Sequence, residues 1–190
     1  MGNDTKQILL KATRDLIDKQ GIAEISMRTV GKAAHLSRGA LYRHFDNKES
    51  LLAAIVIENF HIMKEKFAEL EEKIRNPRQL LFELSIQYYN FGINNPDHYQ
   101  LMFNTKWDED KYPDVKQAAI DVFNKFIFFV SMALKSRQLN QKLLLEKTAV
   151  LYACIHGVVE LHLAGHNKPE KGLNDITPLI NHALDSIIKK

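Results

Sequence analysis

The stretch Ser26–Leu52, SMRTVGKAAHLSRGALYRHFDNKESLL, predicts two short helices joined by a tight turn and followed by the start of a third helix. Ser26 and Ser37 stand where the first two helices begin, and a serine hydroxyl there can accept a hydrogen bond from an unpaired N–H of the opening turn. Leu41 and Phe45 lie four residues apart on the inner face of the second helix. Two helices of about two turns joined in this way form a helix-turn-helix, whose second helix enters the major groove of DNA.

The residues after this motif add a second signal. Asp46 and Asn47 end the second helix and can cap the next one, so Lys48 falls in the first turn of that helix. A lysine there opposes the helix dipole and gains nothing from local helix energetics. Its position makes sense if a DNA phosphate lies in front of the helix end, within reach of the ammonium and the backbone N–H groups.

The same stretch resembles, in order and without a gap, the DNA-binding segment of TetR-family transcriptional regulators. Two positions depart from the family pattern, since Gly31 replaces a small alanine and His35 replaces the glycine of the turn. His35 must either adopt a left-handed backbone or belong to a different turn. The matching residues are Ser26, Val30, Ala34, Leu36, Ser37, Gly39, Leu41, Tyr42, His44, Phe45, Lys48, Glu49 and Leu51.

The resemblance implies DNA contacts for individual residues. Arg28, Arg38 and Ala40 are expected at base edges, because arginine suits guanine and an alanine methyl suits thymine. The expected phosphate contacts come from Ser26, Ser37, Tyr42, His44 and Lys48, with close approach of the backbone at Gly39.

The positive charge of the chain is concentrated in the same region. The 190 residues include 26 Lys/Arg and 23 Asp/Glu, which gives a formal net charge of +3. Residues 1–50 hold nine of these basic residues and six of the acidic ones, so the rest of the chain is electrically balanced. This excess agrees with attraction to phosphates, but it is too small to establish DNA binding by itself.

The bulk features predict a soluble cytoplasmic protein. Cys154 is the only cysteine, so no internal disulfide can form, and the start of the chain lacks the basic and apolar pattern of a signal peptide. The longest strongly apolar run, Phe126–Leu134, is about half of the ~18 residues that would suggest a membrane span.

The helical periodicity predicts an all-α fold, with no strand-like alternation, glycine-rich phosphate loop or internal repeat. We expect a three-helix helix-turn-helix DNA-binding domain over residues 1–46 and a helical ligand-sensing and dimerisation bundle over residues 47–190. One uninterrupted helix from Asn47 to about Arg75 should join them. The other predicted helices cover residues 4–20, 77–94, 96–105, 113–137, 141–166 and 177–189.

The last two predicted helices carry more apolar surface than a monomer would bury. Residues 149–159, AVLYACIHGVV, are apolar nearly all the way round, and the final helix carries a broad apolar stripe. Packing within one chain is one interpretation. A twofold-symmetric homodimer through these helices is the other, and the resemblance to the TetR family implies it. Such a dimer would read a palindromic operator with half-sites about 34–36 Å apart, or a multiple of that spacing.

Aromatic side chains of the second domain are candidates for a ligand site. They could surround a cavity for an apolar or aromatic molecule, although aromatic residues at helical spacing are more often plain core. His156 lies inside the apolar run, four residues after Tyr152, and a histidine there is costly unless it has a partner. This segment resembles a TetR subgroup with a Trp-His-Gly signature, with Tyr152 in place of the tryptophan. The candidates are Tyr88, Phe103, Trp107, Phe123, Phe126, Tyr152 and His156.

Metal and enzyme chemistry have weaker support. His162 and His166 are four residues apart and could share a metal ion, but their helix face carries no third ligand. The sequence has no cofactor loop and no spacing of nucleophile and base, and Cys154 lies in an apolar run where a thiol would be inert. We therefore expect no catalytic site, no resident cofactor and no metal.

Together these observations predict a homodimeric transcriptional repressor of TetR type that binds operator DNA and is released by a small ligand. Its partners would be double-stranded DNA, a second copy of the chain and a small-molecule effector, without a membrane. A different class remains open, namely a dimeric DNA-associated adaptor whose bundle binds a protein partner instead of a small ligand.

Overall fold

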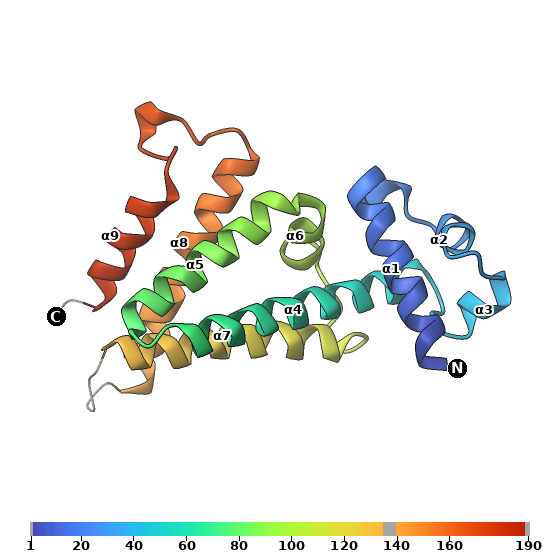
Figure 1. Ribbon diagram of the computed structural model, residues 1–190, viewed down its shortest axis with the longest axis horizontal. Helices are drawn as coiled ribbons and strands as arrows, with labels where there is room; N and C mark the ends of the chain where they lie inside the picture. Colours follow the sequence, from blue (N-terminus) through green and yellow to red (C-terminus); the bar gives the residue numbers. More distant parts are fainter. Residues whose placement is uncertain (1, 135–139, 189–190) are drawn as a thin grey trace. The chain divides into compact units, whose positions relative to one another are not determined.

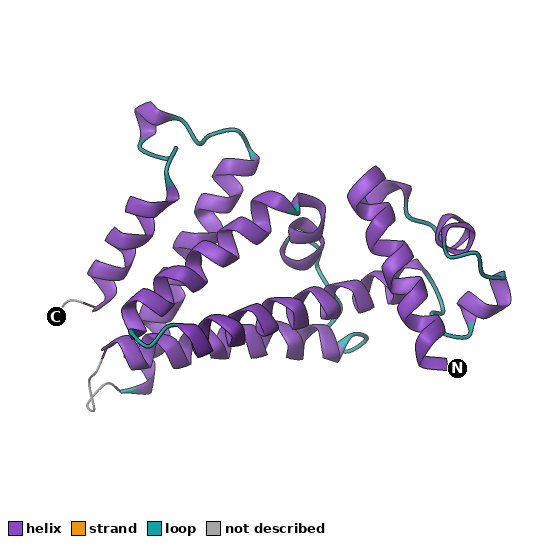
Figure 2. Ribbon diagram, in the orientation of Figure 1, coloured by secondary structure: helices purple, strands orange, loops and turns teal. Residues whose placement is uncertain are grey.

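The computed structural model describes residues 2–134 and 140–188. All regular elements in these ranges are helices, as Figure 2 shows, and the predicted all-α fold is confirmed. The predicted helix ends at residues 137 and 189 lie outside the described residues. The elements in Figure 1 are α1 (Gly2–Gln20), η1 (Ile22–Glu24), α2 (Met27–Ala33), α3 (Arg38–Tyr42), α4 (Lys48–Lys73), α5 (Pro77–Asn94), α6 (Pro96–Phe103), α7 (Pro113–Leu134), α8 (Gln141–Leu163), η2 (Pro169–Lys171) and α9 (Ile176–Ile188).

The described residues form two compact units. The head unit contains the residues up to His61 together with Asn95–Ala119, and the bundle unit contains Ile62–Asn94 together with the residues from Ile120 onward. Helices α4 and α7 each contribute to both units without a break. These units do not coincide with the predicted domains, because they group α6 and the first half of α4 with the helix-turn-helix. The functional domain boundary between residues 46 and 47 stays a prediction.

The head unit is held together by α1. This helix packs against α2, the short 3₁₀ helix η1 and α6, while α2 packs against α3. An ion pair between Arg14 and Glu58 also joins α1 to α4. Burial of large apolar side chains from all these helices stabilises the arrangement. Among the buried residues are Leu9, Ile17, Ile25, Val30, Leu41, Leu51, Ile55 and Phe60.

The bundle unit is built on α5, which packs against both α8 and α9, and α8 and α9 also pack against each other. Arg78 at the start of α5 donates to Asp185 Oδ1 at 2.7 Å and to Asn181 Oδ1 at 3.1 Å, which fastens α9 to α5. The buried residues of this unit include Leu81, Leu84, Tyr88, Phe126, Leu151, Ile155, Ile180 and Leu184.

The two helices predicted to form the dimer differ in how much apolar surface they leave exposed. Helix α9 buries Ile180, Leu184 and Ile187 within its own chain. Helix α8 buries one face and leaves an opposite apolar face open, where Val150 is 57% exposed and Leu161 is also exposed. Most of the apolar stripe of α9 is therefore covered within one chain, whereas α8 keeps an exposed apolar face that a partner could cover.

Three predicted helix ends need correction, and one of them is that of α4, which stops at Lys73 rather than at about Arg75. Helix α8 stops at Leu163 rather than at residue 166, because Gly165 adopts φ +74° and the His166 N–H donates to the Leu161 carbonyl at 2.7 Å. Helix α6 stops at Phe103 rather than at residue 105.

Helix α7 is long and apolar enough, by length and composition, to cross a membrane, and it alone passes this test within residues 2–134 and 140–188. The core helix of a soluble protein passes the same test, and α7 buries Val122, Phe126 and Phe129.

Candidate nucleic-acid interface and aromatic cluster

The helices of the helix-turn-helix are capped by the two predicted serines. Ser26 Oγ accepts from the Thr29 N–H at 3.1 Å, and Thr29 Oγ1 accepts from the Ser26 N–H at 2.9 Å, which forms a complete capping box. Ser37 Oγ accepts from the Ala40 N–H at 3.2 Å. Both hydroxyls therefore already cap α2 and α3, and their phosphate contacts stay predictions.

The turn between α2 and α3 uses a left-handed residue. His35 has φ +53°, its N–H donates to the Lys32 carbonyl at 3.2 Å, and the Leu36 N–H donates to the Gly31 carbonyl at 3.0 Å. These two bonds define a Schellman motif, in which glycine is the usual left-handed residue. Of the two alternatives for His35, the left-handed backbone is the correct one, and the turn keeps the usual geometry despite the substitution.

A basic groove lies on the exposed side of α2 and α3. Its volume is about 420 Å³. The guanidinium of Arg38 lies 5.2 Å from the centre of the Tyr42 ring, a distance at which a cation and an aromatic face attract. Arg28 and Lys32 are one helical turn apart on α2, so Lys32 extends the predicted basic set and could have been found from that spacing. The groove is lined by Met27, Arg28, Gly31, Lys32, Leu36, Arg38 and Tyr42.

Other predicted DNA contacts are placed differently. Ala40 is only 7% exposed, so its methyl lies inside the head unit, and this burial argues against a contact with a base edge. Gly39 is exposed, and a Cβ added there would meet nothing within 4 Å, which leaves room for close approach of another molecule. His44 is half-buried with its ring tilted against Phe45.

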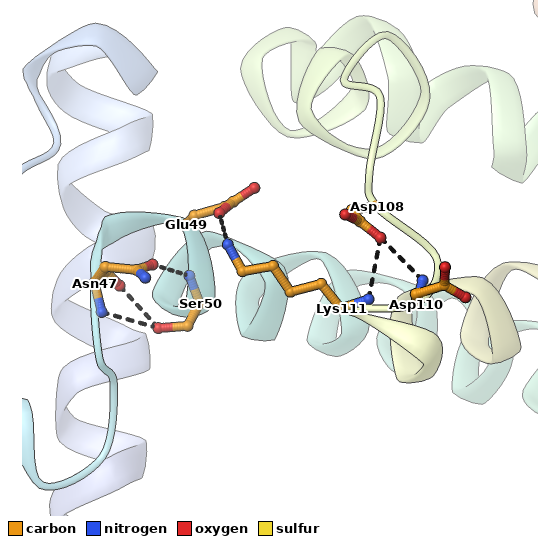
Figure 3. Close-up of polar contacts among 6 residues, drawn as sticks. All are labelled: Asn47, Glu49, Ser50, Asp108, Asp110 and Lys111. Atoms are coloured by element: carbon orange, nitrogen blue, oxygen red, sulfur yellow. Dashed lines mark hydrogen bonds and ion pairs between the residues drawn. The ribbon is translucent and has the colours of Figure 1, made fainter.

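The start of α4 is fixed by side chains of its own first turn. Asn47 Oδ1 accepts from the Ser50 N–H at 2.9 Å, and Ser50 Oγ accepts from the Asn47 N–H at 3.2 Å, so Asn47 caps α4 as predicted (Figure 3). Lys48 Nζ donates to the Ile22 carbonyl at 3.2 Å. This bond ties α4 to η1 and gives Lys48 a structural role that needs no phosphate. Its phosphate contact stays a prediction.

The loop before α7 also reaches the start of α4. Lys111 forms an ion pair with Glu49, while Asp108 Oδ1 accepts from the backbone N–H groups of Asp110 and Lys111 at 3.0 and 3.1 Å (Figure 3). The ion pair raises the pKa of Lys111 and lowers the pKa of Glu49. Both side chains are solvent-exposed, so this pair contributes little to stability.

A buried histidine joins three helices of the head unit. His98 on α6 is 3% exposed, its Nδ1 lies 3.0 Å from Asn59 Nδ2 on α4, and its Nε2 lies 3.1 Å from Asp18 Oδ1 on α1. These partners suit the neutral ring, in which Asn59 donates to Nδ1 and Nε2–H donates to the carboxylate. Burial lowers the pKa of His98, and Asp18 partly offsets this effect. His98 was not predicted as a site residue from the sequence, and it lies in the segment PDHYQLMF that forms all of α6.

The bundle unit brings five of the seven predicted ligand residues together. The Tyr88 hydroxyl lies 3.0 Å from the Tyr152 hydroxyl and 2.8 Å from His156 Nε2. Phe123 and Phe126 pack edge-to-face against Tyr152, with ring centres 5.2 and 6.0 Å away. We call Tyr88, Phe123, Phe126, Tyr152 and His156 the aromatic cluster. Burial lowers the pKa of His156 to about 4 and raises the pKa of Tyr152, so both are neutral near pH 7.

The other two predicted ligand residues lie in the head unit. Phe103 packs against Phe60 and Tyr99, with ring centres 5.6 and 5.0 Å away. Trp107 Nε1 donates to the Leu101 carbonyl at 3.0 Å, and its ring packs against Tyr112. The predicted set is therefore divided between two units, and Phe103 and Trp107 have packing partners of their own.

Two residues were considered from the sequence for special chemistry, His162 as a metal ligand and Cys154 as a reactive thiol. His162 Nδ1 lies 2.6 Å from the Tyr89 hydroxyl. Within residues 2–134 and 140–188, no three His, Cys, Asp or Glu side chains gather in a group that could hold a metal ion. Burial raises the pKa of Cys154, which keeps the thiol protonated.

Comparison with known families identifies both halves of the chain. Residues 9–55 match the family model described as bacterial regulatory proteins, tetR family, and residues 81–187 match the one described as tetracyclin repressor-like, C-terminal domain. The HTH-type transcriptional regulator TtgR of Pseudomonas putida is 23% identical over 195 residues, covering 97% of this chain and 91% of that protein. The HTH-type transcriptional regulator UidR of Escherichia coli is 33% identical over 70 residues, covering 37% of this chain and 36% of that protein.

Solved structures share the fold across nearly the whole chain. A protein of unknown function from Rhodococcus sp. RHA1 has a TM-score of 0.81 at 19% identity, covering 97% of this chain and 94% of that one. SmeT, the repressor of the Stenotrophomonas maltophilia multidrug efflux pump SmeDEF, has a TM-score of 0.66 at 21% identity, covering 96% and 88%. SmeT is also known in complex with triclosan.

Proposed function

The chain belongs to the TetR family of bacterial regulatory proteins and is a DNA-binding transcriptional regulator rather than an enzyme, and on this premise we propose that it is a repressor. It acts in the cytoplasm, binds a palindromic operator as a homodimer, and is released by a small, largely apolar or aromatic ligand. The observation that carries the proposal is the exposed basic groove on α2 and α3.

Sequence readout is assigned to Arg28 and Arg38, whose guanidinium groups can bond two atoms of one guanine. Stacking on Tyr42 restricts the conformations of Arg38 before DNA arrives, so less entropy is lost on binding. Lys32 joins Tyr42 as a candidate for phosphate contact, because it lines the same groove.

The DNA proposal can be tested by selecting bound duplexes from a randomised library. We expect enrichment of an inverted repeat. Arg38→Ala should relax the preference at one position of each half-site, at a cost of about 1–3 kcal/mol, and Lys32→Ala should weaken binding to all duplexes alike. Lys168→Ala, an exposed lysine of the bundle unit, is the control. Binding without any enriched repeat would contradict the proposal.

Dimerisation is supported by the exposed apolar face of α8. Sedimentation equilibrium should give twice the 21.9 kDa mass of one chain. Val150→Arg places a charge on that face and should yield monomers. Met132→Arg makes the same kind of change on the exposed side of α7 and should leave the dimer intact. If Met132→Arg dissociates the dimer and Val150→Arg does not, the interface lies on α7 rather than on α8.

Release by a ligand requires that the ligand prefer the form that does not bind DNA. Helix α4 contributes residues to both units, which provides a covalent route for coupling. A shift from 1:99 to 99:1 between the two forms needs about 5.5 kcal/mol of differential affinity. Equal affinity of a ligand for the free and the operator-bound protein would rule out this mechanism.

The adaptor function has one observation in its favour. Helix α7 exposes Ile120, Phe128 and Met132 along one face of the bundle unit, and Phe128 is 48% exposed. A protein partner could cover such a face. In cells, an adaptor would lose regulation on Phe128→Arg and keep it on Tyr152→Phe, whereas a ligand-responsive repressor would show the opposite pattern.

A further inference from the structure

A second groove of the head unit lies between α1 and the end of α2, and its lining residues differ from those of the basic groove on α2 and α3. Its volume is about 430 Å³. Ile8, Ala12 and Leu16 line it from α1, and Ala33 and Ala34 line it from the end of α2. Each of these five side chains keeps part of its surface accessible. We call this site the α1–α2 groove, and much of its lining is apolar.

Helix α1 is apolar on two sides. Leu9 and Ile17 are completely buried on the side that holds the head unit together. Ile8, Ala12 and Leu16 recur every four residues along the neighbouring side, over about 12 Å or two helical turns. Ile8 is 43% exposed there. A helix that carries apolar side chains at the same spacing could cover this side of α1.

Basic side chains border the apolar part of the groove. Lys11 and Lys19 line it from α1 and are two turns apart, with Asp15 halfway between them. Neither lysine forms an ion pair within the part of the chain that the structure describes. Asp15 offsets one of the two positive charges, so the border keeps a positive excess. An occupant with carboxylates complements this excess, and a basic occupant does not.

His35 places a further polar group at the groove, at a position where a side chain is strained. Its φ is +53°, and a left-handed backbone favours glycine. The side chain is exposed and lines the α1–α2 groove from the turn after α2. An imidazole there can donate to a carboxylate or accept from an N–H of an occupant. Such a contact gives the strained side chain a use.

We propose that the α1–α2 groove binds an acidic amphipathic helix of another protein. Apolar side chains of this helix pack against Ile8, Ala12 and Leu16, and its carboxylates meet Lys11 and Lys19. A DNA backbone fits less well, because phosphates gain nothing from an apolar lining. The site belongs to the head unit, so a protein bound there can change operator binding without contacting the bundle unit.

The probe is a phage-displayed library of random peptides of about 14 residues, the length of four helical turns. It is selected against the full chain in the presence of excess nonspecific duplex DNA, which competes for the basic groove on α2 and α3. We expect the recovered peptides to carry net negative charge and large apolar residues three or four positions apart. Recovery of no peptide, or of basic peptides, would overturn the proposal.

Substitutions then locate the bound peptide, and fluorescence anisotropy measures its affinity. Ala33→Gln fills the groove without changing its charge and should weaken the best selected peptide at least tenfold. Ala23→Gln makes the same change at an exposed alanine of η1 and should leave the affinity unchanged. Thermal unfolding checks that both variants are folded. Unchanged affinity in folded Ala33→Gln would overturn the site.

The charge of the border is tested by a double variant. Lys11→Gln combined with Lys19→Gln should weaken the peptide at least fivefold, whereas Lys32→Gln, in the basic groove on α2 and α3, should leave it unchanged. Binding of a nonspecific duplex is measured on the same variants. If the double variant weakens duplex binding as much as Lys32→Gln does and leaves the peptide unaffected, Lys11 and Lys19 face DNA and the proposal is wrong.

His35→Gly separates a binding role from a structural one. The substitution relieves the strain of the turn, so a purely structural residue would give a more stable chain with the same peptide affinity. We expect a more stable chain that binds the peptide at least threefold more weakly. Unchanged affinity would overturn the contact assigned to His35.

Discussion

The two units each contain a histidine among hydrogen-bonding partners, but the partners differ. His98 in the head unit is buried, and both ring nitrogens meet side chains from other helices, one of them the carboxylate of Asp18. His156 in the bundle unit is partly accessible and meets the Tyr88 hydroxyl, which can donate or accept. The comparison teaches that a carboxylate partner fixes which ring nitrogen of a histidine carries the hydrogen, whereas a phenol partner leaves that choice adjustable.

The largest difference should appear when each imidazole is replaced by an apolar side chain. His98→Leu should lower the free energy of unfolding by about 3–4 kcal/mol, because the buried Asn59 amide loses its partner and two bonds between helices disappear. His156→Leu should cost at most about 1 kcal/mol, because the Tyr88 and Tyr152 hydroxyls still bond each other. Urea denaturation measures the free energy of unfolding of both variants. Equal losses in the two variants would contradict the proposed difference between the histidines.

The dependence of stability on pH should separate the two histidines next. The pKa of His156 is about 4 in the folded chain and about 6.5 in the unfolded chain. At a pH between these two values, His156 therefore takes up a proton when the chain unfolds. The unfolded state then binds more protons, so stability is complete above pH 6.5 and falls by about 2–3 kcal/mol as the pH drops to 4. His156→Leu should flatten the stability curve in this window. His98→Leu should flatten it less, since Asp18 offsets part of the effect of burial.

Within the aromatic cluster, the two tyrosines should contribute unequally. Tyr88→Phe removes the central hydroxyl and leaves Tyr152 and His156 each without that partner, so we expect a loss of about 1–2 kcal/mol. Tyr152→Phe removes only an end of the chain and should cost about 0.5–1 kcal/mol. Thermal unfolding of the pair at pH 7.5 tests this order. A larger cost for Tyr152→Phe would place the centre of the network elsewhere.

The smallest predicted effect compares one backbone motif in both units. His35 and Gly165 each follow a helix with positive φ, at +53° and +74°. His35→Gly should raise the free energy of unfolding by about 0.5–1 kcal/mol, and Gly165→Ala should lower it by about 1 kcal/mol, because a side chain strains a left-handed backbone. A stabilising Gly165→Ala would contradict this reasoning.

The local features of the DNA-binding part were predictable from the sequence. Caps at Ser26, Ser37 and Asn47 depend on residues within three positions of one another, and the structure confirms them. The left-handed backbone at His35 was one of two predicted alternatives, because the conformation of a turn also depends on neighbouring residues. Ala40 was assigned to the DNA by resemblance, but a five-residue helix leaves little choice of which side faces the core, and Ala40 is buried there.

Contacts between distant segments were not predictable in this way. His98 meets Asp18 and Asn59 across 80 and 39 residues, and the PDHYQLMF segment does not reveal these partners. Lys48 was predicted to contact a phosphate because a lysine in the first turn of a helix opposes the helix dipole. The fold instead places the Ile22 carbonyl 3.2 Å from its Nζ. Five of the seven predicted ligand residues meet, while Phe103 and Trp107 lie in the other unit.

By itself, the sequence determined the helices, their caps and the helix-turn-helix, because these depend on propensities and hydrogen bonds within a few residues. Only the tertiary structure decided which histidine meets a carboxylate and which one lies among phenols. Burial, the pKa values that follow from it, and the choice between a carboxylate and a hydroxyl as partner depend on residues that folding brings together from distant parts of the chain.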